Sequence, residues 1–404
     1  MTRRRTPDQD AENQTSESTS PHSTHESDPE IIQRHKDLID GIKAWYNVLI
    51  RLRYIKPDEI YQPPHHSSSR ARPAVAVRQL QLLGFDDEVV RLAHHLPWPC
   101  KRVLCNSYVG HGLPILPGQA AAVTYLDDAG TEVLACLRDP LQLGKRDIAP
   151  WALAFTHVRP GKGAGDVLVY DTRDRTLTAW PRSDYDNLQE NHVEEEKHTY
   201  LAHPRRPAVA VLAEIMANFE QLAWLPSREE DRFFRIERVP DWDAWAAKHA
   251  HTLAAATTDG RAAASVQLAR DGCNRFHAYR NIFLRCGWPD HFDGEAFERE
   301  STAWMEELRF LEEVVEYKGR MKEIADRRLP QTQGPVAEMI TRKLDLSFQT
   351  FKTSMLQKGR ILDAEDFDSF METPVAQDQE RLSEFLRRSA GESARSFSIP
   401  SHFL

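Results

Sequence analysis

The chain lacks any apolar run of about 18 residues, the length from which a membrane-spanning helix is predicted. Its N-terminus is basic at residues 3–5, but no apolar stretch follows, so the sequence predicts no secretory signal. The five cysteines are odd in number and scattered along the chain. This usage indicates reduced thiols rather than a disulfide framework, and we therefore expect a cytoplasmic or nuclear protein without a membrane partner.

An excess of positive charge is also missing, because the net charge is −9 at pH 7. This balance argues against a general nucleic-acid binder, which usually presents a basic face. Hydrophobic residues make up 41% of the chain, below the average of about 45–50% for globular proteins. Large apolar side chains are scarcest at the two ends. We therefore expect a disordered tail over residues 1–29 and a mostly disordered tail over residues 359–404.

Recognisable catalytic signatures are absent from the sequence. No G-x-S-x-G nucleophile elbow and no H-E-x-x-H metal motif occurs. The glycine-rich stretch 161–165 is followed by a β-prone run rather than a helix, so it predicts a hairpin loop and not a phosphate cradle. The sequence thus predicts no catalytic residue, no bound metal and no cofactor.

Three short apolar runs stand out in a chain that is otherwise mostly helical. They predict strands over 151–158, 166–171 and 176–180, and the short connections between them favour antiparallel pairing. A further hairpin is expected from strands 120–126 and 132–137 around the turn at 127–130.

Helical periodicity covers most of the remaining chain. Near the N-terminus one helix face is marked at spacings of 4, 3, 4 and 3 by Leu38, Ile42, Trp45, Leu49 and Leu52. Further helices are expected over 73–84, 86–96, 207–222, 241–256, 261–286, 293–327 and 335–358. In the longest of them the apolar stripe breaks at Lys318, so we expect an antiparallel pair of 293–327 with 335–358 rather than a sustained coiled coil.

The predicted fold class is α+β: a small, mainly antiparallel sheet flanked by helices, with a helical C-terminal half. Between the tails we divide the chain into an N-terminal helix and loop (30–72), an α+β domain (73–225) and a helical region (226–358).

Two functional classes other than a protein-binding scaffold stay open: an enzyme and a zinc-stabilised module. An enzyme would assemble its site over the sheet from distant groups, for which the candidates are His94, His95, His157, Asp166 and Asp171. A zinc-stabilised module would use Cys100 and Cys105, which are separated by four residues, together with neighbouring histidines that include His111. Asp171 and Asp174 also flank a turn, where an aspartate commonly bonds its own backbone.

The block 150–181 resembles the core of the SUKH superfamily. The matching residues are Pro150–Ala154, Gly165–Asp171 and the return strand to Trp180-Pro181. This superfamily includes fungal cell-wall and signalling scaffolds and bacterial toxin-immunity proteins. The resemblance covers at most residues 74–225, and it implies a non-enzymatic protein-binding domain.

Together these observations favour a non-enzymatic interaction or scaffold protein with a protein partner. The binding residues that we expect on the sheet are Trp151, Asp166, Asp171 and Trp180. Tryptophan is enriched among binding hot spots, so a face shared by Trp98, Trp151 and Trp180 would be an interface.

Overall fold

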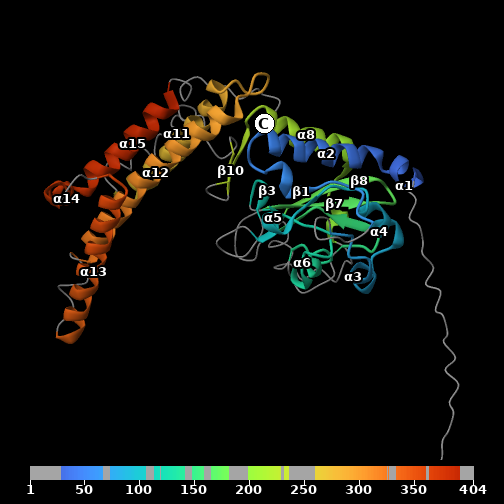
Figure 1. Ribbon diagram of the computed structural model, residues 1–404, viewed down its shortest axis with the longest axis horizontal. Coiled ribbons are helices and arrows are strands. Elements are labelled where there is room, and N and C mark those ends of the chain that lie inside the picture. Colours follow the sequence, from blue (N-terminus) through green and yellow to red (C-terminus); the bar gives the residue numbers. More distant parts are fainter. Residues whose placement is uncertain are drawn as a thin grey trace, which may run out of the picture.

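The computed structural model describes residues 29–66, 73–105, 113–118, 120–141, 148–158, 165–181, 199–228, 232–235, 260–324, 326, 334–360 and 364–391. The predicted helix 241–256, the glycine turn at 161–164 and residues 1–28 lie outside this range. An α+β body and a long helical arm make up the molecule (Figure 1). The predicted α+β class is confirmed.

Two antiparallel sheets form the centre of the body. The larger has the order β5-β7-β8-β9, with strands Ala152–Ala154, Asp166–Asp171, Thr176–Pro181 and Arg205–Pro207. The smaller has the order β3-β4-β6, with strands Pro114–Leu116, Ala120–Ala122 and Thr156–Val158. The antiparallel pairing predicted for the strands of block 150–181 is confirmed.

One predicted strand, 151–158, is divided between the two sheets. Its first part, β5, pairs with β7, and its second part, β6, pairs with β4. At the junction, the amide of Phe155 donates to the carbonyl oxygen of Leu168 at 2.8 Å. The chain therefore changes sheets at this buried phenylalanine, which joins the two sheets into one core.

The predicted strand 132–137 is wrong, because this segment forms a short helix followed by a turn. Helix α6 spans Thr131–Ala135 and follows Gly130, whose φ is +80°. Glu, Leu and Ala favour helix, and the buried Leu134 and Leu137 are spaced for one helix face. The partners of β4 are instead β3 and β6.

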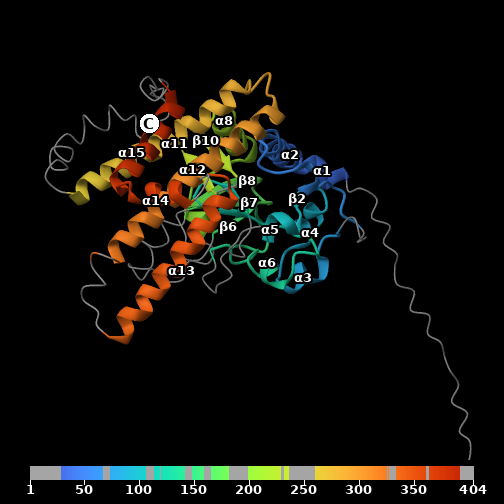
Figure 2. The same cartoon turned by 60° about the vertical axis from the view of Figure 1, so that its left-hand side comes forward.

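Two long helices lie side by side across the body (Figures 1 and 2). They are α2 (Lys36–Arg51), preceded by the short α1 (Pro29–Arg34), and α8 (Ala208–Glu220). The predicted N-terminal apolar face is confirmed, since all five of its residues are buried. At Gly41 the helices approach so closely that a Cβ atom would lie 2.6 Å from Cδ1 of Leu212.

Short elements complete the body. They are η1 (Pro57–Glu59), η2 (Thr199–Ala202), α3 (Val77–Leu82), α4 (Asp87–Ala93), α5 (Lys101–Cys105), β1 (Ile60–Tyr61) with β2 (Trp98–Pro99), and β10 (Trp224–Ser227) with β11 (Arg232–Arg235). Arg228 binds the buried Glu59 through both terminal nitrogens, at 2.7 and 2.6 Å. This pair ties the end of β10 to the N-terminal segment 30–72.

The C-terminal half consists of α11 (Gly260–Arg285), α12 (Gly294–Glu323), α13 (Pro335–Gln357), α14 (Ala364–Glu372) and α15 (Val375–Ala390). The predictions for α11, α12 and α13 are confirmed. The prediction of a mostly disordered tail over 359–404 is wrong for α14 and α15. Their sequences are rich in charge, but Phe367 and Leu386 are fully buried, and α15 packs along α11 and α12.

Helix α12 connects the body to the tip of the arm, which consists of the C-terminal part of α12 with α13, α14 and the start of α15. Near its start, Trp304 stacks on Phe385 of α15 as part of the main core. Further along, α12 runs antiparallel to α13, because Glu307 binds Arg360 at 2.5 Å and Tyr317 stacks on Phe351 at 4.0 Å. The predicted antiparallel pair is confirmed.

The break in the apolar stripe at Lys318 marks a buried ion pair. The Lys318 ammonium lies 2.8 Å from Oδ2 of Asp378 in α15, and each of the two side chains is 3% exposed. It also donates to the carbonyl oxygens of Phe370 and Thr373. One lysine therefore holds the end of α14 and the start of α15 against α12.

None of the helices in the described part of the chain is long and apolar enough to cross a membrane.

Candidate functional site

Trp151 and Asp171 are in contact at one end of the larger sheet. The indole Nε1–H of Trp151 donates to Oδ2 of Asp171 at 3.0 Å. Oδ1 of Asp171 accepts the backbone amides of Arg173 and Asp174 at 2.9 and 3.1 Å. The Arg173 guanidinium covers the Trp151 ring at 3.6 Å. One oxygen of the buried Asp171 carboxylate thus closes the β7–β8 turn, and the other holds the Trp151 indole.

Asp166 and Trp180 lie at the other end of β7. Trp180 pairs with Val167, and a six-residue strand places this end about 17 Å from Asp171. Trp180 is fully buried and has Tyr200 as a ring neighbour. The four predicted binding residues therefore do not form one surface. Trp98 is also buried, so Trp98, Trp151 and Trp180 share no exposed face.

The residues of the enzyme alternative come from three different elements of the body. His94 and His95 lie at the end of α4, His157 is on β6, and both aspartates are on β7. The His66 ring stacks on His94 at 5.1 Å between centroids, and Nδ1 of His94 lies 2.8 Å from the carbonyl oxygen of His65.

The electrostatic surroundings of His95 disfavour a charged imidazole. Burial lowers the pKa of His95, and neighbouring His66, Arg91 and Lys43 lower it further. Among the described residues, no group of three or more His, Cys, Asp or Glu side chains is placed to hold a metal ion. Of the proposed zinc ligands, Cys100 is a buried free thiol, whereas His111 lies outside the described residues.

A buried chain of hydrogen bonds, which sequence reasoning missed, crosses the gap between the helices and the sheet. His35 separates α1 from α2 and is 1% exposed. Its Nδ1 lies 2.8 Å from the Tyr170 hydroxyl, and its Nε2 lies 3.0 Å from Oε1 of Glu88. With the proton on Nε2, Tyr170 donates to His35 and His35 donates to Glu88.

Burial and charge keep this chain of hydrogen bonds in one protonation state. Burial is the main cause that lowers the pKa of His35, which favours the neutral ring. For Glu88, burial acts to raise the pKa, but hydrogen bonds from Arg34 and His35 outweigh it and hold the pKa below its usual value. The pKa of Tyr170 is raised, mainly by burial. The neutral Tyr170 and His35 and the Glu88 carboxylate thus form a set of hydrogen bonds that attaches the junction of α1 and α2 to β7.

His35 and Tyr170 line a cavity of about 300 Å³. It lies between the start of α2, the β7–β8 turn and the start of α8, and its other lining residues include Arg175, Thr176 and Val209. The backbone of this turn is unusual, because Arg175 has a φ of +58°, a value that glycine and asparagine adopt more readily. The sequence alone does not reveal this conformation.

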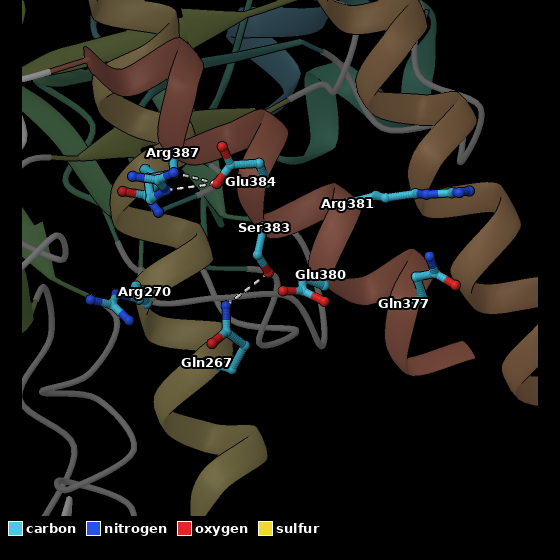
Figure 3. Close-up of a pocket in the computed structure, with 9 residues that line it drawn as sticks. Gln267, Arg270, Gln377, Glu380, Arg381, Ser383, Glu384 and Arg387 are labelled. Atoms are coloured by element: carbon cyan, nitrogen blue, oxygen red, sulfur yellow. Dashed lines mark hydrogen bonds and ion pairs between the residues drawn. The ribbon is translucent and has the colours of Figure 1, made fainter. Parts of the chain in front are cut away.

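Figure 3 shows a second, polar groove between α11 and α15. Several of its side chains bind one another: Gln267 donates to Oγ of Ser383 at 2.8 Å, and Arg387 binds Glu384 on the same helix. Ligand pockets usually combine apolar walls with few polar groups. This groove has a polar lining whose groups are partly engaged already, which is typical of a solvated helix surface.

A third groove, of about 410 Å³, lies between α12 and α13 and is lined mostly by apolar side chains. It is lined by Tyr317, Arg320, Met321, Ile324, Met339, Ile340, Lys343, Leu344 and Ser347. Met339 is 50% exposed, and Val336 and Leu346 on the same helix are more exposed still. The tip of the arm therefore presents apolar side chains to solvent.

Comparisons with protein-family models, with curated proteins and with solved structures find no match to this chain.

Proposed function

We propose that this protein is a non-enzymatic scaffold of the cytoplasm or nucleus that binds a protein partner through its helical arm. The observation that carries this proposal is the apolar groove between α12 and α13. Burial of apolar surface is the main driving force of protein association, and methionine adapts to varied partners. The resemblance to the SUKH superfamily, which implies a protein-binding domain, supports the same class of function.

The groove fits an amphipathic helix that carries acidic residues. The two charged side chains that line it, Arg320 and Lys343, are both basic, and Arg320 also forms an exposed ion pair with Glu316. A helix that lays its apolar face into a groove gains affinity from that face, while complementary charge at the rim sets orientation and speeds association. The partner is thus expected to present apolar residues at helical spacing with Asp or Glu beside them.

The experiment compares full-length proteins that differ only at exposed apolar positions. Wild type, Met339→Glu and a control, Leu268→Glu on α11, are used as tagged baits in cells of the source organism. Both replaced side chains are exposed, so neither change opens the core. A partner identified by mass spectrometry is then purified and titrated. We expect Met339→Glu to weaken binding at least about tenfold, as for a hot spot, while the control binds like wild type.

Two results would contradict the use of the groove. One is a partner retained equally by Met339→Glu and by wild type but lost by Trp151→Ala, which would move the site to the sheet. The other is a wild-type dimer, seen by light scattering, that Met339→Glu dissociates, because a second copy would then occupy the groove.

A further inference from the structure

Helix α14 contacts both helices that form the groove at the tip of the arm, although the groove itself is lined by α12 and α13. Toward α13, the ring centroid of Phe367 lies 5.2 Å from that of Phe348 and 6.1 Å from that of Phe351. Toward α12, the carbonyl oxygen of Phe370 accepts from the Lys318 ammonium, which also lies 4.1 Å from the centroid of the Phe370 ring. Helix α14 therefore bridges the two walls of the groove.

A buried ion pair continues this bridge into α15. We call residues 364–378, which comprise α14 and the first turn of α15, the strap. The Lys318 ammonium lies 2.8 Å from Oδ2 of Asp378, and each side chain is 3% exposed. An ammonium that is buried without its carboxylate is strongly unfavourable, whereas water hydrates both charges once the strap has left α12. The pair therefore favours either a docked or a released strap over intermediate positions.

The strap depends on these contacts for its own order. Helix α14 has nine residues, and isolated helices shorter than about 12–15 residues are only marginally stable in water. Phe367 is fully buried, whereas Phe370 and Met371 are partly buried. A helix this short, with so few buried side chains, is stabilised mainly by docking on α12 and α13.

The groove wall formed by α13 depends in turn on the strap. The exposed ion pairs that join the end of α13 to α12, such as Lys358 with Glu313, contribute little to stability. Closer to the groove, Tyr317 of the groove lining stacks on Phe351 at 4.0 Å. Phe351 belongs to the small buried cluster that Phe367 of the strap completes. Removal of the strap would expose this cluster to solvent and weaken the contact between α12 and α13.

We propose that the strap regulates the groove: docked on α12 and α13 it holds the groove walls together, and its release lets α13 move away from α12. This inference rests on the proposed function for the partner that the groove binds. A partner helix that binds only the intact groove stabilises the docked strap, and by the same coupling free energy the docked strap strengthens binding of the partner. Asp378 thus acts as a positioning residue for a groove that it does not line.

The first test breaks the contact with α12 and measures the effect on α13. Hydrogen exchange of the full-length protein is followed by mass spectrometry over residues 335–347, which form the groove wall, over 364–378 and over β7. Asp378→Ala should accelerate exchange over 335–347 at least about tenfold, because breaking a buried ion pair strongly favours the released strap. β7 should keep the wild-type rate. Acceleration over 364–378 with 335–347 at the wild-type rate overturns the proposal.

The second test breaks the contact with α13 and measures the effect on α12. Phe367→Ala leaves the ion pair unchanged in sequence, and the readout is the rate at which acetic anhydride modifies the Lys318 ammonium. We expect this rate to rise at least about tenfold, because loss of a fully buried ring favours the released strap. Asp368→Ala, which removes an exposed partner of Lys352 on α14, is the control and should behave like wild type in both tests. Unchanged reactivity of Lys318 in Phe367→Ala overturns the proposal as well.

A partner identified with the wild-type bait then tests the regulation of binding. It should bind Asp378→Ala at least about tenfold more weakly, because the fraction of protein with a docked strap falls, and it should bind Asp368→Ala like wild type. A partner that binds both Met339→Glu and Asp378→Ala like wild type contradicts the proposed use of the groove. The exchange and acetylation measurements involve no partner, so they decide on the strap separately.

Discussion

The body and the tip of the arm are both built from amphipathic elements, yet they bury their apolar faces to very different extents. In the body, α2 and α8 cover sheets whose strands are mostly buried apart from the exposed β9, and one core continues into α11 and the start of α12. Among the described residues of the tip, the buried cluster contains Val314, Phe351, Met355 and Phe367, with partly buried and mostly aromatic residues around them. Helix α13 remains mostly exposed along its length.

The two regions therefore differ in the interactions that stabilise them and in the surface that they leave accessible for binding. The body is stabilised by a large apolar area, and among its candidate residues Trp180 is inaccessible and Asp171 is used to close a turn. The tip depends on a small cluster and on the buried pair Lys318–Asp378. Elements with few buried contacts open most readily, so the tip is expected to be the less stable of the two. It is also the region with an open apolar groove.

The largest effect is expected from a substitution that opens a cavity in the core of the body. Trp180→Ala should lower the free energy of unfolding by about 3–5 kcal/mol, because a fully buried indole leaves both lost contacts and a void. Chemical denaturation followed by fluorescence and circular dichroism measures this value. A loss below about 1 kcal/mol would mean that the body core is not continuous around this residue.

The matching test for the tip removes one member of its ion pair. Asp378→Ala leaves the buried Lys318 ammonium with only two carbonyl oxygens, and we expect a loss of about 3 kcal/mol confined to the tip. Hydrogen exchange should accelerate in α13, α14 and the start of α15, while β7 stays protected. Asp368→Ala, which removes an exposed partner of Lys352, should cost about 0–1 kcal/mol. Equal acceleration in β7 would show that body and tip unfold as one unit.

A smaller effect is expected from the turn of the β7–β8 hairpin. Asp171→Ala removes the acceptor of the Trp151 indole and of two backbone amides, and it should lower the free energy of unfolding by about 1–3 kcal/mol. Trp151→Ala keeps the two amide bonds and should cost less. The order of the two losses, measured by denaturation, decides whether Asp171 acts mainly on the turn or on the tryptophan.

The smallest expected effect is a pH dependence that belongs to the body. Burial lowers the pKa of His35 from 6.5, so below pH 6.5 the unfolded chain binds a proton that the folded chain does not. The unfolded state then holds more protons, and stability falls as the pH drops through this range towards the folded pKa. His35→Gln should reduce the slope of unfolding free energy against pH between 7 and 5. An unchanged slope would assign the dependence to other groups, such as His95.

Much of the architecture followed from the sequence because it depends on local pattern. Apolar spacing predicted α2, α11, α12 and α13, and short connections between β-prone runs predicted antiparallel β7 and β8. The segment 132–137 was misassigned, since a short apolar run fits either a strand or a helix until its neighbours are known. The composition of α14 and α15 was misleading. A charge-rich helix needs only a few buried residues to be ordered when it packs against another helix.

The candidate sites separate the features that local sequence determines from those that depend on tertiary structure. By itself the sequence determined the kinds of side chain available, the lack of a recognisable catalytic signature, and the turn at Asp171, because these depend on residue type and near neighbours. Only the tertiary structure placed His35 between Tyr170 and Glu88, set Arg175 beside Thr176 and the start of α8, buried Lys318 against Asp378 and left the arm groove open. These juxtapositions join residues far apart in the chain, and they arise from the packing of whole elements, for which no local pattern carries the information.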